Sequence, residues 1–116
     1  MRALIVDDNE DMRSLLRLTM ELAGIDVAAE AADAAECVRH WQEHEPDVII
    51  LDQRMPGPTG LDAAEYILRH DPATLILLFS AYLDPEAMAR ARRLGIRTVG
   101  KDRVRDLPSL IGVDAA

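Results

Sequence analysis

The sequence contains one cysteine (Cys37), one lysine (Lys101) and few aromatic residues, which make up 3% of its 116 residues. A single cysteine cannot form a disulfide within the chain, in agreement with a reducing compartment. No apolar run is long enough to span a membrane, and the amino terminus lacks the apolar segment and cleavage site of a signal peptide. We therefore expect a cytoplasmic protein without membrane attachment.

Basic residues are outnumbered, with 13 Lys and Arg against 21 Asp and Glu and a formal net charge of −8. Phosphate contacts require basic surface, so this balance argues against direct binding of nucleic acid by this domain. Apolar residues make up 49% of the chain, enough for one core, and no linker-like stretch divides it. We expect a single domain over residues 1–116, with a short last helix and no output domain.

Short apolar runs alternate with segments of helical periodicity. The expected strands are 2–6, 26–30, 47–51, 75–79 and 97–100. The expected helices are about 10–23, 33–44, 61–69 and 85–94, followed by one short helix within 102–112 whose start is limited by Pro108. We assign to the core side of the first two helices Met12, Leu15, Leu16, Leu22, Ala23, Ala34, Cys37, Val38 and Trp41. This alternation predicts an α/β fold, a parallel sheet with helices on both faces.

Polar side chains follow the expected strands at their carboxyl ends, where α/β proteins collect functional groups. Asp7 and Asp8 follow the first strand, Asp52 the third, Ser80 the fourth and Lys101 the fifth. Three carboxylates at one edge form a site for a hard divalent cation such as Mg²⁺, which would offset their repulsion. A carboxylate at Asp52 could then attack a phosphoryl group, with the Ser80 hydroxyl and the Lys101 ammonium facing the phosphoryl oxygens.

Four segments in this order, "LIVDDNE", "PDVIILDQRMPGPTG", "LFSA" and "VGK", resemble the receiver domain of bacterial two-component response regulators. The resemblance covers Arg2 to about Ile111. It implies a flavodoxin-like, doubly wound (βα)5 fold with a five-stranded parallel sheet of order 2-1-3-4-5. It also implies a signalling phosphoacceptor rather than an enzyme, limited to self-catalysed phosphoryl transfer and autodephosphorylation. The phosphodonor would be a phosphohistidine on a sensor histidine kinase or a histidine phosphotransfer protein, and the phosphorylated domain would switch a protein-interaction surface.

The resemblance also assigns roles to individual residues. Asp52 would be the phosphoacceptor, and Asp8 and Asp52 would bind Mg²⁺ directly. Arg54 would add its backbone carbonyl, and Asp7 would act mostly through water. The two remaining positions, Ser80 and Lys101, would be the switch hydroxyl and the phosphoryl-binding ammonium.

The sequence departs from the family at three places. Thr98 stands where an aromatic residue is usual, three positions before Lys101, so we expect a response confined to about residues 80–90. Tyr82 could take over part of the aromatic role or cover the site. Asp102 stands where proline is common, which makes a cis peptide unexpected. The final helix is short, although the family often uses it for homodimer formation.

Other functions fit less well. A flavodoxin-like nucleotide binder needs a Ser-, Thr- or Gly-rich phosphate cradle after the first strand, and "DDNED" would repel phosphate. A haloacid-dehalogenase-type phosphatase has its nucleophile in a D-x-D motif after that strand. Here the two aspartates after the first strand are adjacent, and the isolated Asp52 follows the third strand. A receiver-like module that binds proteins without phosphorylation stays open. His40 and His44 have zinc-ligand spacing, but without another ligand in spacing we interpret them as solvated surface residues.

Overall fold

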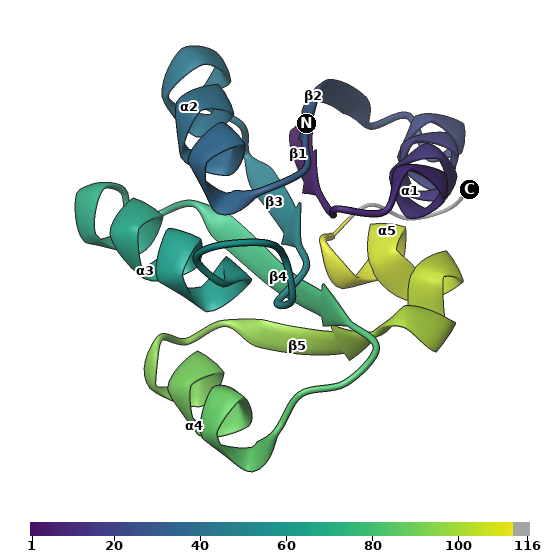
Figure 1. The fold of residues 1–116 in the computed structure, drawn as a ribbon. Coiled ribbons are helices and arrows are strands. Elements are labelled where there is room, and N and C mark those ends of the chain that lie inside the picture. The colour runs from purple at the N-terminus through teal and green to yellow at the C-terminus, as the bar shows by residue number, and fades with distance from the viewer. Residues whose placement is uncertain (113–116) are drawn as a thin grey trace.

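Five parallel strands form one sheet in the order β2-β1-β3-β4-β5 (Figure 1). The computed structural model describes residues 1–112, and the strands in it are β1 (Arg2–Val6), β2 (Asp26–Ala31), β3 (Val48–Leu51), β4 (Leu75–Ser80) and β5 (Arg97–Gly100). Each neighbouring pair is parallel. The predicted fold class and strand order are confirmed.

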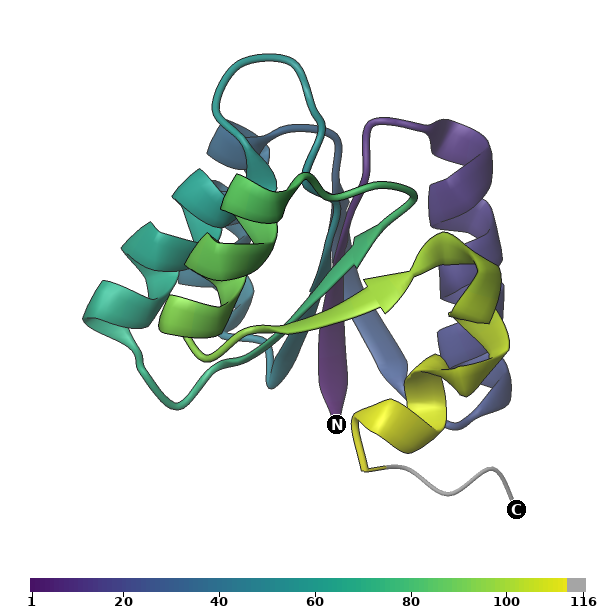
Figure 2. The same ribbon diagram turned by 90° about the horizontal axis from the view of Figure 1, so that it is seen from below.

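Helices cover both faces of the sheet, as the view in Figure 2 shows edge-on. The α-helices are α1 (Glu10–Leu22), α2 (Ala34–His44), α3 (Gly60–His70), α4 (Pro85–Arg93) and α5 (Leu107–Leu110). α1 and α5 lie on one face, and α2, α3 and α4 lie on the other. Two hydrophobic clusters result, one on each side of the sheet. The four residues of β3 are therefore all buried, which explains their unbroken apolar sequence.

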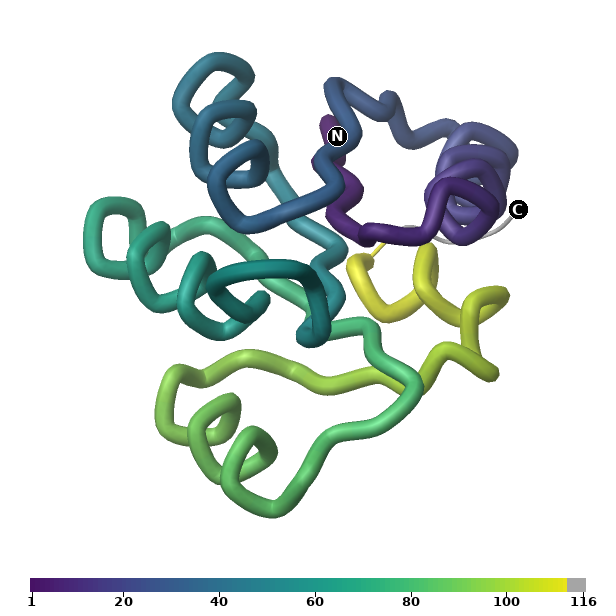
Figure 3. The backbone as a smooth tube through the Cα atoms, viewed as in Figure 1, coloured from purple at the N-terminus to yellow at the C-terminus, as the bar shows by residue number. Residues whose placement is uncertain are grey.

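The path of the chain reverses direction between β1 and β3 (Figure 3). From β1 the chain passes through α1 to β2 on one side, and then through α2 to β3 on the other side of β1. The crevice at the carboxyl ends of two such strands is the usual binding position in doubly wound sheets. Asp7 and Asp52 follow these two strands directly.

Polar side chains cap the helices that leave the carboxyl edge of the sheet. Asn9, Asp33, Thr59 and Asp84 each accept a hydrogen bond from a backbone N–H of the first turn of their helix. Thr59 forms a reciprocal capping box with Asp62. These caps satisfy backbone donors that would otherwise lack partners, and they fix the loops around the site.

The core side of α1 differs from the expectation at two positions. Leu16 and Met20 are buried, and Met12 packs against the same cluster. Leu15 and Leu22 are instead 42% and 80% exposed. Both sets of residues have helical spacing, so the periodicity alone cannot decide which stripe faces the sheet.

The prediction for α2 is confirmed for its most buried residue. Cys37 is fully buried, and burial together with the charge of Asp33 raises the pKa of its thiol to about 12. Such a thiol is not reactive. Trp41 is partly buried and packs against the core, with its ring in an edge-on arrangement 6.3 Å from that of Tyr66 on α3.

The last part of the described chain contains two helical segments where one was expected. A 3-10 helix, η1 (Lys101–Asp106), precedes α5. Pro108 lies in the first turn of α5, where its missing N–H needs no partner, so a single continuous helix through this point is disfavoured. No cis peptide occurs in residues 1–112, and none of their helices combines the length and the apolar character required to cross a membrane.

Candidate functional site

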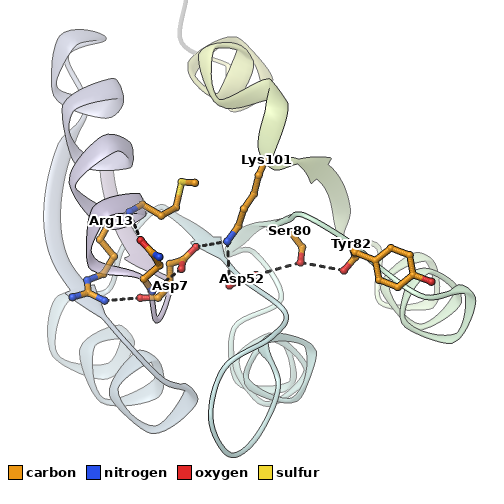
Figure 4. Close-up of polar contacts among 8 residues, drawn as sticks. Asp7, Arg13, Asp52, Ser80, Tyr82 and Lys101 are labelled. Carbon is orange, nitrogen blue, oxygen red and sulfur yellow. Dashed lines mark hydrogen bonds and ion pairs between the residues drawn. The ribbon is translucent and has the colours of Figure 1, made fainter.

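The carboxyl ends of four strands bring the predicted site residues together (Figure 4). Asp7 follows β1, Asp52 follows β3, Ser80 ends β4 and Lys101 follows β5. Asp7, Asp52 and Ser80 are buried, at 1%, 5% and 6% exposure. Residues separated by up to 94 positions in the sequence, from Asp7 to Lys101, thus form one polar cluster.

Lys101 joins the two buried aspartates. Its Nζ lies 2.9 Å from Asp7 Oδ2 and 3.3 Å from Asp52 Oδ2. The Lys101 side chain is 21% exposed, so this ammonium reaches into the cluster from the protein surface. Because both acids are buried, the single positive charge offsets a repulsion that would otherwise destabilise the fold.

The ionisation of the cluster follows from this arrangement. Burial, and then the charge of Asp7, raise the pKa of Asp52, and Lys101 and Ser80 oppose that rise only in part. Burial lowers the pKa of Lys101, but its hydrogen bond to Asp7 and the charge of Asp52 outweigh this effect and raise it overall. Lys101 is therefore charged at neutral pH, and Asp52 is a more basic carboxylate than one in water.

Ser80 already faces the second oxygen of Asp52. Its Oγ lies 3.2 Å from Asp52 Oδ1 and 3.4 Å from the backbone carbonyl of Tyr82, so the one hydroxyl proton is shared between two long contacts. The hydroxyl is close enough to meet a new oxygen acceptor on Asp52 without a large rotation. The two carboxylate oxygens of Asp52 are thus approached from different sides by Ser80 and Lys101.

Three carboxylates converge in an acidic pocket that could bind a metal ion. Asp7, Asp8 and Asp52 each offer an oxygen within 4.8 Å of those of the other two. Asp8 is exposed, whereas Asp7 Oδ2 is buried and has no hydrogen bond among the described residues beyond its ion pair with Lys101. An all-oxygen donor set of this kind suits a hard divalent cation.

Arg54 and Tyr82 lie on the surface, in the segments that follow β3 and β4. The Arg54 guanidinium carbon is 5.5 Å from the centre of the Tyr82 ring, and the Tyr82 side chain is 60% exposed. The ring therefore lies outside the core, held by a cation–π contact worth roughly 0.5–1 kcal/mol at an exposed site. Thr98 pairs with Leu78 and is only partly buried.

Two residues that sequence reasoning missed hold the loop after β1. The backbone N–H of Asn9 donates to Asp7 Oδ1 at 2.9 Å, and Arg13 Nη1 donates to the Asp7 carbonyl oxygen at 2.7 Å. Arg13 Nε also lies 3.3 Å from a carboxylate oxygen of Glu30 on β2. The available signal was a basic residue near the amino-terminal end of α1, six positions after Asp7, where the helix dipole favours negative charge.

Gly60 allows α3 to begin against the backbone of Asp52. A Cβ atom at this position would collide with the Asp52 carbonyl oxygen. The N–H of Gly60 donates to the carbonyl of Gln53, and the Gln53 side chain accepts from the N–H of Leu61. The glycine of the D-x-x-M-P-x-x-x-G segment thus closes the loop after Asp52 tightly.

Comparisons with known proteins agree with this fold. The response regulator receiver domain family matches residues 3–101. The chemotaxis protein CheY of Thermotoga maritima is 35% identical over 96 residues, 83% of this chain and 80% of that protein. Among solved structures, the response regulator domain of Thermotoga maritima CheB has a TM-score of 0.85 at 26% identity and covers 96% of this chain and 92% of its own.

A second kind of relative shares only part of its length with this chain. A protein-glutamate methylesterase/protein-glutamine glutaminase of Haloarcula marismortui is 41% identical over 86 residues, which are 74% of this chain but 23% of that protein. The chain spans about a quarter of this relative, so the match concerns its receiver portion. The chain belongs to the response regulator receiver domain family, whose members are phosphoacceptors in two-component signalling.

Proposed function

We propose that Asp52 is the phosphoacceptor of this receiver domain and takes a phosphoryl group from a phosphohistidine, with Mg²⁺ bound beside it. The observation that carries this proposal is the position of Asp52. It is a buried carboxylate at the end of a central strand, faced by a hydroxyl, an ammonium and two further acids. Phosphoryl transfer requires mainly such positioning and charge compensation.

Asp52, Lys101 and Ser80 have different roles in the phosphoryl transfer. One carboxylate oxygen of Asp52 attacks the phosphorus atom, and the bond from phosphorus to the donor histidine nitrogen breaks, its electron pair returning to the imidazole. Lys101, which already contacts Asp52, neutralises charge on the phosphoryl oxygens, and the Ser80 hydroxyl donates a hydrogen bond to one of them. Both groups are in place before the reaction and need little reorganisation.

Mg²⁺ would be held by Asp8 and Asp52 directly, by the backbone carbonyl of Arg54, and by Asp7 through water. When bound, the ion supplies positive charge that draws the carboxylate and phosphoryl oxygens together. The oxygen-only donor set of the acidic pocket supports this choice of ion. Asp7 is the residue that Lys101 neutralises most closely, in agreement with an indirect role.

The partner would be a sensor histidine kinase or a histidine phosphotransfer protein in the cytoplasm. Phosphorylation would switch a protein-interaction surface near the loop after β4, because Ser80 lies at the end of that strand. A homodimer would form through a different surface, the carboxyl-terminal face that includes α5. A receiver-like module that binds partners without phosphorylation is the second candidate. The intact cluster of polar residues argues against it, while Thr98 and Asp102, which depart from the family pattern, leave it open.

Acetyl phosphate and Mg²⁺ distinguish the two candidates. We expect a single phosphoryl adduct by mass spectrometry in the wild-type protein and none in Asp52→Asn, which keeps the shape but removes the nucleophile. Asp102→Asn is the matched control, because it makes the same change at an exposed position next to Lys101. The absence of an adduct in the wild-type protein would favour the binding module, and an adduct that persists in Asp52→Asn would move the nucleophile elsewhere.

A further inference from the structure

A second group of metal-ligand side chains lies at the end of α2, away from the aspartates. His40, Glu43 and His44 each offer a ligand atom within 4.8 Å of those of the other two. α2 runs back from the carboxyl edge of the sheet, so its last turn lies at the opposite edge. There Arg2, at the start of β1, donates from Nη1 to the His44 carbonyl oxygen. This group is therefore separate from the pocket of Asp7, Asp8 and Asp52.

The three side chains converge without satisfying one another. Glu43 Oε2 lies 3.7 Å from His40 Nδ1 and 3.8 Å from His44 Nε2, and the imidazole centres are 5.6 Å apart. Both distances are too long for hydrogen bonds. Ligands about 2.0–2.1 Å from one tetrahedral ion are roughly 3.3 Å apart, so small side-chain rotations would bring these atoms to ligand spacing.

His40 Nδ1 is free to act as a ligand. This nitrogen is buried and has no hydrogen-bond partner among the described residues, although buried polar atoms are usually satisfied. The His40 and His44 side chains are 21% and 33% exposed, while Glu43 is 55% exposed. The cluster is thus partly buried at His40 and open to solvent at Glu43.

The electrostatic potential at the end of α2 also favours binding of a cation. Glu43 and His44 lie in the last turn of α2 and His40 lies just before it, near the helix end where unpaired carbonyl groups give a partial negative charge. The chain as a whole carries a formal charge of −8. Arg2 acts in the other direction, because its guanidinium contacts the His44 carbonyl.

We propose that His40, Glu43 and His44 form a binding site for a divalent transition-metal ion, with Zn²⁺ as the best fit. Two imidazole nitrogens and one carboxylate oxygen suit Zn²⁺, whereas Mg²⁺ prefers oxygen ligands only. Three protein ligands leave the fourth tetrahedral position to water or to a group from a partner protein. The interpretation of the histidines as solvated surface residues omitted Glu43, whose carboxylate completes the set.

The experiment is a Zn²⁺ titration of the ¹⁵N-labelled protein, followed by amide resonances, with Mg²⁺ in large excess to occupy the acidic pocket. We expect Zn²⁺ to shift the resonances of about residues 38–46 while those of 7–10 and 52–55 stay in place. His44→Gln removes one ligand at a partly exposed position and should weaken Zn²⁺ binding by roughly tenfold or more. Glu43→Gln is a second, exposed variant in case His44→Gln affects folding.

Two control variants test whether Zn²⁺ binding is specific to this cluster. His70→Gln removes the histidine of α3, whose Nδ1 contacts the Tyr66 carbonyl at 2.8 Å, and should leave Zn²⁺ binding unchanged. Asp52→Asn should also leave it unchanged, so the outcome does not depend on the phosphoacceptor proposal. Zn²⁺ shifts limited to the acidic pocket, or Zn²⁺ binding of wild-type strength in both His44→Gln and Glu43→Gln, would overturn the proposal.

Discussion

Lys101 Nζ is closer to Asp7, at 2.9 Å, than to Asp52, at 3.3 Å. The ammonium is therefore shared between the residue that would carry the phosphoryl group and a buried neighbour that would not. A phosphoryl group on Asp52 would bring new negative charge to this point. This charge would attract the Lys101 ammonium towards Asp52. The negative charges of the loop after β1 would then be less well neutralised.

Replacement of Lys101 by glutamine should affect stability and metal binding in opposite directions. The variant leaves Asp7 and Asp52 buried without a cation, so we expect the free energy of unfolding to fall by about 1–3 kcal/mol in the absence of metal. Mg²⁺ should bind more tightly to the variant, since no ammonium competes for the same oxygens. Denaturant unfolding with and without Mg²⁺ measures both effects, and weaker Mg²⁺ binding in the variant would contradict this account.

The raised pKa of Asp52 should make its contribution to stability depend on pH. The folded protein keeps the Asp52 proton at pH values where the unfolded chain, with an ordinary pKa of 3.8, has released it. The stabilising contribution is full below pH 3.8 and is lost as the pH rises through the raised pKa. Asp52→Asn should therefore be more stable than the wild type at neutral pH, and this difference should shrink as the pH falls through the raised pKa.

Urea unfolding at a series of pH values tests that prediction, with Asp102→Asn as the exposed control. The difference should amount to about 1.4 kcal/mol for every pH unit between the folded and unfolded pKa values. Mg²⁺ binding should weaken over the same pH interval, because protons compete for the Asp52 oxygens. A stability difference between Asp52→Asn and wild type that is constant from neutral pH to below pH 3.8 would show that Asp52 has an ordinary pKa.

Arg13 should act on metal binding through the backbone of Asp7. Arg13→Gln removes the 2.7 Å contact with the Asp7 carbonyl, and we expect Mg²⁺ affinity to fall roughly tenfold as the loop loses its fixed geometry. Arg17→Gln is the matched control, since Arg17 also pairs with Glu30, at 2.6 Å, one helical turn further along α1. Equal losses in the two variants would assign the effect to the ion pairs with Glu30 instead.

Gly60→Ala should impair phosphorylation beyond its effect on stability. The new methyl group would push the Asp52 backbone or the start of α3 out of place, at a cost of about 1–3 kcal/mol. Thr59→Ala removes the neighbouring cap and costs about 0.5–2 kcal/mol without touching Asp52. Phosphorylation by acetyl phosphate should slow in the first variant only. A similar rate in both variants would show that the tight turn is needed for stability alone.

The response to phosphorylation should stay close to the loop after β4. Thr98 is β-branched, with few rotamers, and lies next to Leu78 on the face covered by α3 and α4. Since Ser80 already faces Asp52, its rotation is small, and no large ring at position 98 follows it. Amide shifts on addition of beryllofluoride should concentrate at residues 80–90. Shifts of equal size around Thr98 in β5 would contradict this expectation.

Most of the fold could be predicted because each strand is an apolar run that ends at polar residues. Asp52 and Lys101 are polar residues directly after apolar runs, and parallel strands bring such positions to one edge. The burial of Asp7 could not be predicted in the same way, because Asp8 has the same chemistry and only the twist and register of β1 distinguish them. The ion pair of Arg13 with Glu30 depends on the pairing of β1 with β2, where the register shifts between Ala3 and Leu4.

The errors have equally local causes. Leu15 and Leu22 belong to a second stripe of apolar residues on α1, and a helix with two such stripes does not reveal which one the sheet covers. Pro108 limits the start of the last helix, as predicted. The 3-10 helix η1 before it was not predicted, because six residues are too few to show a periodic pattern of apolar side chains. The interpretation of His40 and His44 as surface residues stays a prediction, and the structure adds that the Glu43 carboxylate lies beside both.

The wide sequence separation of the site residues has a consequence for synthesis of the protein. Asp7 and Asp52 can meet as soon as β3 pairs with β1, but their counter-charge comes from position 101, after β5. If β1, β3 and β4 pair before β5 is made, Asp7 and Asp52 come together while no lysine is yet available to face them. We expect protons or Mg²⁺ to compensate the two acids until Lys101 is available, so that refolding without Mg²⁺ would be slower for a chain that lacks β5 and Lys101 than for the full domain.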